Sequence, residues 1–341
     1  MAKLRNVALL TGAGFTKSFG GYLSREMWAR IFNHSNIQNQ KKLRECMLNQ
    51  LNFEYAYAAV METDNYNIKE KDSFTEAVRD AFRNMHGKIF DPTNPNLEWL
   101  YSLFEIFLPP FGDIADECTM FFTLNQDLCV EVAHGHSKST DPAMELLGIP
   151  KDLWFQHDIV GLLESDPILL PFKEDLEAMK DHLSASHPGG FIYVKLHGSY
   201  GWNKPDGSHA MVIGDLKSTT IAGEPLFTWY HEVFRDTLLN KGQKLIVIGY
   251  SFRDAHINKS IADGVSKGGL RLYIIDPMDP ETLKQHLQSL PIAPDYSVEH
   301  TGDVIWGGLS GYYQCELGDL YGQFEFTPEG ETFIEALGLI K

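Results

Sequence analysis

The sequence contains only four cysteines, and no two of them form a Cys-x-x-Cys pair. A structural zinc site of the tetrahedral type needs closely spaced ligands, so we expect no bound metal. Sparse and dispersed cysteines are also typical of the reducing cytoplasm, where disulfides are rare. We therefore expect a cytoplasmic protein. The four cysteines are Cys46, Cys118, Cys129 and Cys315.

Long hydrophobic runs are also missing. No stretch of 18 or more apolar residues occurs, so the sequence predicts no transmembrane helix. The apolar run near the start, Val7–Leu10, is too short for the hydrophobic region of a signal peptide. We therefore expect no membrane association.

Basic residues are few compared with acidic ones. The chain of 341 residues has 29 Lys and Arg against 46 Asp and Glu, which gives a formal charge of −17. So acidic a surface repels a phosphate backbone, so we expect no broad nucleic-acid binding, although a local basic patch is compatible with these numbers. Hydrophobic residues make up 43% and charged residues 22%, which is typical of a globular protein with one large domain or two smaller ones.

Five short apolar segments are separated by helical or long connections. This alternation predicts an α/β protein with a Rossmann-like open parallel sheet and helices on both faces. Ligands bind at the carboxyl ends of the strands in such sheets, so the residues that follow each segment are the candidate site. The predicted strands are Val7–Leu10, Cys118–Thr123, Phe191–Leu196, Lys244–Gly249 and Leu270–Asp276.

Two regions are added to this sheet. Between the first two strands, apolar side chains recur at helical spacing, which predicts a helical insertion at about 34–110. Near the end of the chain, Val304–Trp306 and Gly322–Phe326 predict short antiparallel strands, before a final helix from about Pro328. We therefore expect a small C-terminal tail that contains β-structure.

These features suggest a division of the chain. We expect a nucleotide-binding catalytic domain at 1–290, which includes the helical insertion, and a C-terminal extension at 291–341 that packs on this domain or lies at an oligomer interface. Within the domain, 135–190 contains five prolines and predicts irregular structure with short helical pieces.

The turn Gly12-Ala13-Gly14 follows the first predicted strand. Glycine tolerates positive φ and lets a ligand approach the main chain closely, and we expect a helix to begin nearby, around Ser24. A strand, a glycine turn and a helix N-terminus together suit a pyrophosphate. Gly-x-Gly alone is equally compatible with an ordinary turn, and the third glycine of the dinucleotide fingerprint is absent because position 17 is Lys17.

Polar side chains follow the other strands. Cleavage of the bond between nicotinamide and ribose passes through an oxocarbenium-like transition state, which needs a group that orients the ribose or water and a base. Asn125 suits the orienting role and His197 the base, and Asp276 suits a hydrogen bond to the adenosine ribose. Each residue alone also has an ordinary explanation as a loop, cap or turn residue. Their common position at strand ends favours a site.

The order of these motifs resembles the sirtuin family. The chain is most similar to the divergent bacterial sirtuin-like proteins that hydrolyse NAD in defence against phage, over about residues 5–280. The motifs that carry the resemblance are Thr11-Gly12-Ala13-Gly14-Phe15-Thr16, Thr123-Leu124-Asn125-Gln126-Asp127, Lys195-Leu196-His197-Gly198-Ser199 and Gly249-Tyr250-Ser251-Phe252.

The resemblance implies roles for individual residues, with NAD as the substrate. It implies that Asn125 and His197 are catalytic. It also implies that the first motif lines the NAD phosphates and that Asp127 and the last motif contact the dinucleotide. The dinucleotide-binding residues, with Asp276 included, are then Gly12, Ala13, Gly14, Phe15, Thr16, Asp127, Gly249, Ser251 and Asp276.

Two departures from the protein deacylases of that family bear on the activity. The four-cysteine zinc ribbon has no counterpart, and we find no Phe-Gly-Glu peptide-binding segment after His197. NAD hydrolysis needs only NAD and water, so it is the favoured activity. The alternatives are NAD-dependent protein deacylation, ADP-ribosyl transfer, or a non-catalytic module that senses NAD or ADP-ribose.

The segment after Asp276 is short for an independent sensing domain. The resemblance implies that such an NAD hydrolase is controlled by detection of infection. We therefore expect a homo-oligomer and an activating protein partner in trans, such as a HerA-like ATPase.

Overall fold

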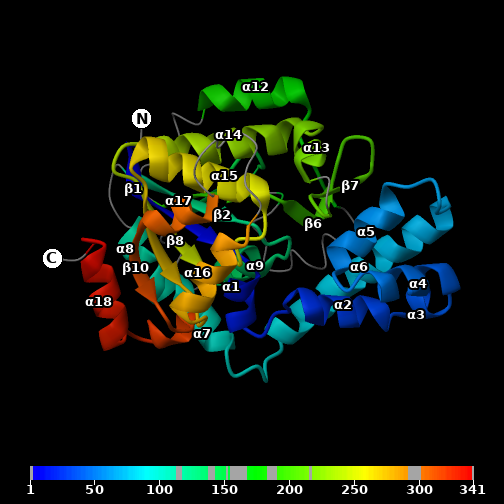
Figure 1. Cartoon of the computed structure of the whole chain (residues 1–341), viewed down its shortest axis with the longest axis horizontal. Helices are drawn as coiled ribbons and strands as arrows, with labels where there is room; N and C mark the ends of the chain where they lie inside the picture. Colours follow the sequence, from blue (N-terminus) through cyan, green and yellow to red (C-terminus); the bar gives the residue numbers. More distant parts are fainter. Residues whose placement is uncertain are drawn as a thin grey trace.

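A seven-stranded sheet forms the centre of the computed structural model, which describes residues 3–112, 117–136, 143–150, 153, 167–182, 190–214, 217–290 and 301–339. Its order is β10-β9-β8-β1-β2-β5-β3, and all neighbouring strands run parallel (Figure 1). The prediction of an open parallel sheet is confirmed. The strands are β1 (Lys3–Thr11), β2 (Glu117–Thr123), β3 (Met144–Leu146), β5 (Phe191–Lys195), β8 (Lys244–Ile248), β9 (Arg271–Ile275) and β10 (Leu309–Tyr313).

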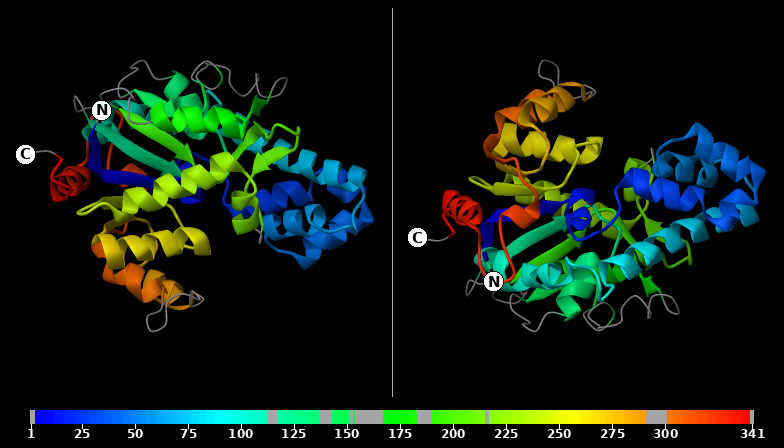
Figure 2. Two further views of the ribbon diagram at one scale, coloured as in Figure 1. Left: turned by 90° about the horizontal axis from the view of Figure 1, so that it is seen from above. Right: turned by 90° about the horizontal axis from the view of Figure 1, so that it is seen from below.

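Helices cover both faces of this sheet. The adjacent β2 residues Phe121 and Phe122 point to opposite faces, as successive strand residues do. The ring of Phe121 contacts Phe15 of α1 (Ala13–Ser18) at 6.4 Å, and the ring of Phe122 contacts Phe234 of α14 (Pro225–Leu239) at 4.9 Å between centroids. Burial on both sides explains why the strands read as continuous apolar runs. Figure 2 shows the helices on either side of the strands.

The connection from β1 to β2 is helical in the part of it that the structure describes. The helices between Ser24 and Ile89 lie together at one end of the molecule in every view (Figures 1 and 2). They are α2 (Ser24–Phe32), α3 (Ser35–Gln38), α4 (Lys41–Asn49), α5 (Phe53–Met61) and α6 (Ile68–Ile89). We call them the helical lobe. The chain then returns through α7 (Leu97–Ser102), a π-helical turn (Leu103–Phe107) and α8 (Pro109–Gly112).

Sequence signals account for the longest of these helices. The side chain of Asn67 accepts a hydrogen bond from the main-chain N–H of Glu70, and the Glu70 side chain accepts one from Asn67. This reciprocal cap fixes the start of α6. Its apolar face, which includes Phe74, Val78 and Phe82, is buried.

The tail differs from its prediction. Val304–Trp306 belongs to a helix, α17 (Thr301–Gly307), and Gly322–Phe326 contributes only an isolated bridge between Tyr321 and Phe326. The expectation of antiparallel strands is therefore wrong. Val304 and Ile305 are buried in α17, so tertiary packing overrides the β-propensity of β-branched residues here.

The tail also contributes one strand of the main sheet and a final helix. The strand β10 extends the parallel sheet beside β9, and the expected last helix is present as α18 (Pro328–Ala336), capped by Thr327. The proposed domain boundary at 290 adjoins residues 291–300, which lie outside the described residues.

The region 135–190, a second small sheet and further helices surround the main sheet. Much of the region predicted to be irregular, 135–190, lies outside the described residues, including Pro142 and Pro188. A small second sheet has the order β4-β6-β7, and of its strands only β4 lies within that region. Its strands are β4 (Ile168–Leu169), β6 (Gly198–Asn203) and β7 (His209–Met211). The other helices are α9 (Cys129–His136), α12 (Lys173–His182), α13 (Lys217–Ala222), α15 (Ala255–Asp263) and α16 (Pro280–Gln288).

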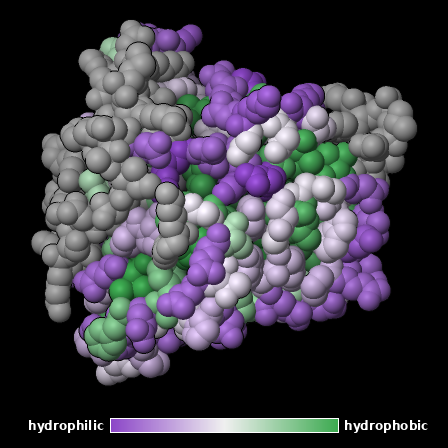
Figure 3. Space-filling model, turned by 90° about the vertical axis from the view of Figure 1, so that its left-hand side faces the viewer, coloured by the Kyte–Doolittle hydropathy of each residue, from purple (hydrophilic) through white to green (hydrophobic). Residues whose placement is uncertain are grey.

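The surface is mixed in character. On the face in Figure 3, hydrophobic residues lie in separate patches among hydrophilic ones. Among the helices that the structure describes, none has the length and apolarity that a membrane span requires.

Candidate functional site

One row of paired residues ends five neighbouring strands. Ile275 of β9 pairs with Ile248 of β8, which pairs with Thr11 of β1. Thr11 in turn pairs with Thr123 of β2, and Thr123 pairs with Lys195 of β5. The predicted site motifs all follow this row, so the sheet brings them to one edge.

The glycines after β1 pack against the turn after β8. The Gly12 N–H donates to the Ile248 carbonyl at 3.0 Å, and the Gly14 N–H donates to the Gly249 carbonyl at 2.9 Å. A Cβ atom added to Gly14 would lie 2.7 Å from the Gly249 Cα atom, and one added to Gly249 would lie 2.4 Å from the nitrogen of Phe15. Such close contact of two main chains requires glycine. The structure thus gives these glycines a packing role, and phosphate contact stays a prediction.

The helix that follows this turn begins earlier than expected. The sequence predicts a helix around Ser24, where α2 begins, but the shorter α1 begins at Ala13, directly after Gly12. In α1, Ala13 is exposed, whereas Phe15 is 1% exposed and packs against Phe19 and Phe121. Phe15 is therefore a core residue in this structure, and its predicted contact with the dinucleotide has no support from its position.

Asn125 joins the first two motifs through its side-chain amide. Its Nδ2 atom donates to the Gly12 carbonyl and to Thr16 Oγ1, both at 2.9 Å. The Thr16 hydroxyl donates in turn to Asp127 Oδ2 at 3.0 Å, while Asp127 Oδ1 accepts from the main-chain N–H of Cys129 at 2.9 Å. Both N–H bonds of the amide are used within the protein, so Oδ1 of Asn125 is the atom that can accept from a ligand. Asp127 acts here as a cap and a partner of Thr16.

His197 lies in a cluster of three histidines. It is 3% exposed, and its Nε2 atom lies 3.1 Å from Nε2 of His256, in the first turn of α15. The ring of His231, on α14, lies 5.1 Å from that of His256, and its Nε2 atom is bonded to the Leu196 carbonyl at 3.1 Å. The third strand-end motif is thus covered by two helices.

Burial keeps these three histidines neutral. Burial, with Lys217, His256 and His231 nearby, lowers the pKa of His197 well below its usual range. Burial also lowers the pKa of His231 to about 4 and that of His256 to about 3. A neutral imidazole can accept a proton, so His197 has the protonation state that a general base needs at neutral pH.

The two remaining predicted residues lie at the β8 and β9 ends. Ser251 is exposed, and its carbonyl accepts a hydrogen bond from Nε2 of His286 at 2.9 Å. Asp276 is half-buried, its Oδ1 atom accepts from the Met278 N–H at 2.8 Å, and burial raises its pKa. Both lie at the predicted edge, beyond β8 and β9 respectively.

Sequence reasoning missed the residues that support this edge from beneath. The ammonium group of Lys195 lies 2.8 Å from Glu131 Oε1 and also donates to the Asp127 carbonyl. Nε2 of His86, on α6, accepts from the N–H of Leu128 at 2.9 Å. A lysine within the apolar run Phe191–Leu196 was a readable signal, because a buried ammonium requires a buried partner.

His231 and His256, which sequence reasoning also missed, were harder to identify from the sequence than Lys195. His256 follows the Gly249 motif within one helical turn, but its contact with His197 depends on how α15 lies over the sheet. Only the three-dimensional structure brings His197, His231 and His256 together. Among the described residues, no group of His, Cys, Asp and Glu side chains is arranged to hold a metal ion.

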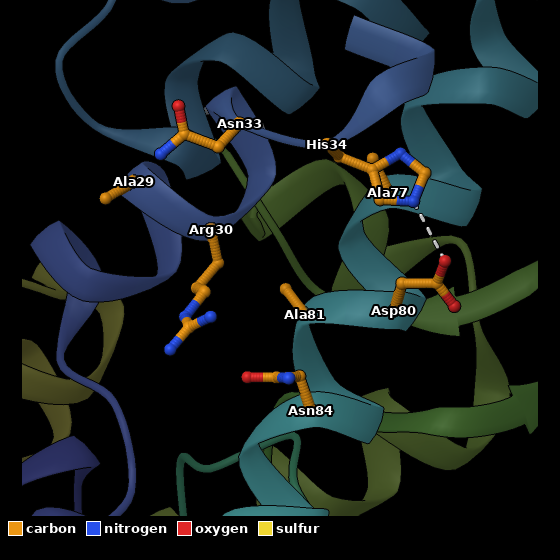
Figure 4. Close-up of a pocket in the computed structure, with 8 residues that line it drawn as sticks. All are labelled: Ala29, Arg30, Asn33, His34, Ala77, Asp80, Ala81 and Asn84. Carbon is orange, nitrogen blue, oxygen red and sulfur yellow. Dashed lines mark hydrogen bonds and ion pairs between the residues drawn. The ribbon is translucent and has the colours of Figure 1, made fainter.

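A separate hollow of about 380 Å³ lies in the helical lobe between α2 and α6. Figure 4 shows Arg30, Asn84 and the hydrogen-bonded pair of His34 and Asp80 along its walls. None of the strand-end residues lines it. We therefore do not identify this hollow with the candidate site.

Comparison with known proteins agrees with this arrangement. Residues 119–295, more than half of the chain, match the family described as the SIR2-like domain. The matched range contains the β2, β5 and β8 motifs, together with His256. A search of curated proteins returns no match. The chain therefore belongs to the SIR2-like family, whose members use NAD.

Proposed function

We propose that this protein hydrolyses NAD+ to nicotinamide and ADP-ribose. The observation that carries the proposal is the register of β2 and β5. Thr123 and Lys195 are paired, so Asn125 and His197 each lie two residues beyond the same row. An amide that accepts hydrogen bonds and a neutral base are thus held at neighbouring strand ends, as cleavage at an anomeric carbon requires.

The chemistry assigns one role to each residue. Oδ1 of Asn125 orients a ribose hydroxyl or the attacking water. The bond between C1′ and the nicotinamide nitrogen breaks, and its electron pair leaves with nicotinamide. The water oxygen bonds to C1′, and His197 takes the proton that the water loses. Among the residues predicted to contact the dinucleotide, those that are exposed or half-buried remain available to it: Ala13, Gly14, Gly249, Ser251 and Asp276.

The cysteines support hydrolysis over deacylation. Cys46 lies in α4, Cys118 in β2 and Cys129 in α9, and all three are buried, whereas Cys315 follows β10. Residues so dispersed in the fold do not resemble the zinc ribbon of the deacylases. Deacylation and ADP-ribosyl transfer remain the second candidates, and elemental analysis with one zinc per chain would favour deacylation.

We further propose a role in defence against phage, in the cytoplasm, with control by a protein partner such as a HerA-like ATPase and by self-assembly. In this proposal residues 1–290 form the catalytic domain and 291–341 an extension. The helical lobe is the proposed interface, because large apolar side chains are exposed on it, among them Leu51 at 75% and Ile68 at 79%. Of the aromatic residues there, Tyr55 is exposed, but Phe53 is core.

The test follows nicotinamide release from NAD+ by the whole protein, alone and with candidate partners. We expect His197→Ala and Asn125→Ala each to lower the rate by about 10² to 10⁴, as loss of a catalytic group does. His136→Gln, at an exposed position at the end of α9, is the matched control and should keep the wild-type rate. Near wild-type release by either site variant would refute its assigned role.

Light scattering of the same samples tests assembly. We expect an oligomer whose activity changes when a partner is added. A strict monomer with full, unregulated turnover would refute the proposed control.

A further inference from the structure

We propose that His256 is the proton acceptor of His197 and carries the proton from the buried base to solvent. This inference rests on the proposed NAD hydrolysis. His256 acts through His197, so it is a positioning and relay residue.

The contact itself is direct. The two Nε2 atoms are 3.1 Å apart, and the ring centroids are separated by 5.3 Å. Two neutral imidazoles at this distance share one hydrogen, because one nitrogen must donate and the other must accept. The pair therefore couples the tautomers of the two rings and holds the orientation of the His197 ring.

Burial explains why a relay is needed. His197 is 3% exposed, so a proton that it gains has little access to water. His256 lies in the first turn of α15 and is half-buried, so it connects the buried ring to the surface. The other neighbouring ring, His231, donates from Nε2 to the Leu196 carbonyl, so that atom cannot accept a proton.

The charges around His256 are compatible with transient protonation. Asp254 lies two residues before it and favours the charged form, whereas Lys217 of α13 and His231 of α14 disfavour it. Lys217 is itself paired with Asp254 and with Glu54 of α5 at 2.9 Å. A protonated His256 is thus short-lived and returns its proton to solvent.

The proton balance of the reaction is complete. NAD+ and water give nicotinamide, ADP-ribose and one proton. His197 accepts the proton of the attacking water, and the hydrogen shared between the two Nε2 atoms moves to His256. Release of a proton from Nδ1 of His256 to solvent leaves both rings neutral, with the shared hydrogen on Nε2 of His256. Proton exchange of both rings with water, once the products have left, restores the starting tautomers.

The experiment measures nicotinamide release against pH for the wild-type protein, His256→Gln and His256→Ala. Gln can keep a hydrogen bond to His197 but cannot carry a proton, so it separates relay from positioning. We expect both variants to lower kcat about 10- to 100-fold, with KM nearly unchanged. The acid limb of the pH–rate profile should move to higher pH, because His256 lowers the pKa of His197 and its loss removes that effect.

Rescue and controls complete the test. Free imidazole should raise kcat of His256→Ala about tenfold. Unfolding in urea should show that both variants remain folded. His136→Gln should behave as the wild-type protein. Wild-type kcat in His256→Gln would overturn the relay while leaving the hydrolase intact. A wild-type protein that never releases nicotinamide would instead overturn the proposed function, and the relay with it.

Discussion

The ammonium group of Lys195 lies 2.8 Å from a carboxylate oxygen of Glu131, and the two side chains are 0% and 1% exposed. Tyr193 donates to the other carboxylate oxygen at 3.3 Å, and Lys195 also donates to the Asp127 carbonyl. A buried ion pair adds little net stability, but its hydrogen bonds can fix one conformation. Here it fixes the loop that carries Asn125.

Loss of one partner of this pair should be costly. Lys195→Met leaves the Glu131 carboxylate buried without its cation, so we expect a loss of about 3–5 kcal/mol in the free energy of unfolding. Urea unfolding measures it. The double variant Lys195→Met/Glu131→Leu should recover most of the loss. A single variant as stable as the wild type would show that the pair does not form.

Gly249 should not tolerate a side chain. Its φ is +61°, and an added Cβ would meet the Phe15 nitrogen at 2.4 Å, so we expect Gly249→Ala to cost about 3 kcal/mol or more. Gly269 is the matched control, since its φ is +67° with nothing within 4 Å of an added Cβ. Gly269→Ala should cost only about 1–2 kcal/mol. Equal losses by urea unfolding would show that main-chain contact at Gly249 is unimportant.

Acid should destabilise the fold through His86. Burial lowers the pKa of His86 to about 4, against 6.5 for an ordinary histidine, so the unfolded chain binds more protons between these values. Stability should therefore fall as pH drops from about 6.5 to 4, by up to about 3 kcal/mol from this group. Unfolding in urea at several pH values measures the slope. The His86→Gln variant should have a flatter dependence over this range, and an unchanged slope would contradict the assignment.

Thr16 should matter for both turnover and folding. Thr16→Val keeps the shape but removes the hydroxyl that links Asn125 to Asp127, so we expect about a tenfold loss of kcat and about 1–2 kcal/mol of stability. Nicotinamide release and urea unfolding measure the two effects. Ser18→Ala, which removes a 3.3 Å bond to the Gly14 carbonyl, is the control and should change kcat less than twofold. Unchanged kcat in Thr16→Val would remove the link from the mechanism.

The sheet and its carboxyl edge were predictable from the sequence because strands buried on both faces leave long apolar runs. Val7–Leu10 and Lys244–Gly249 are such runs, and both are strands. The tail was not predictable in this way. Val304–Trp306 has β-branched residues, but its packing in α17 is decided by residues distant in sequence.

The candidate site was predictable only in part. Asn125 and His197 were found because they follow strands, and their common register then follows from the parallel sheet. The sequence could not show that Phe15 points into the core or that Gly14 and Gly249 are in contact, since both depend on how the two turns pack. The contact of His256 with His197 likewise depends on where α15 lies.

One long helix, α6, connects the helical lobe to the loop that carries Asn125. Helix α6 has 22 residues, and His86, near its end, holds the Leu128 N–H at 2.9 Å. At about 1.5 Å per residue, His86 lies roughly 27 Å from the start of the helix. If α6 rotated as a rigid body by about 2° about its start, His86 would move by about 1 Å, which is enough to break this hydrogen bond. The amide proton of Leu128 is therefore a sensitive reporter of any molecule that binds the lobe.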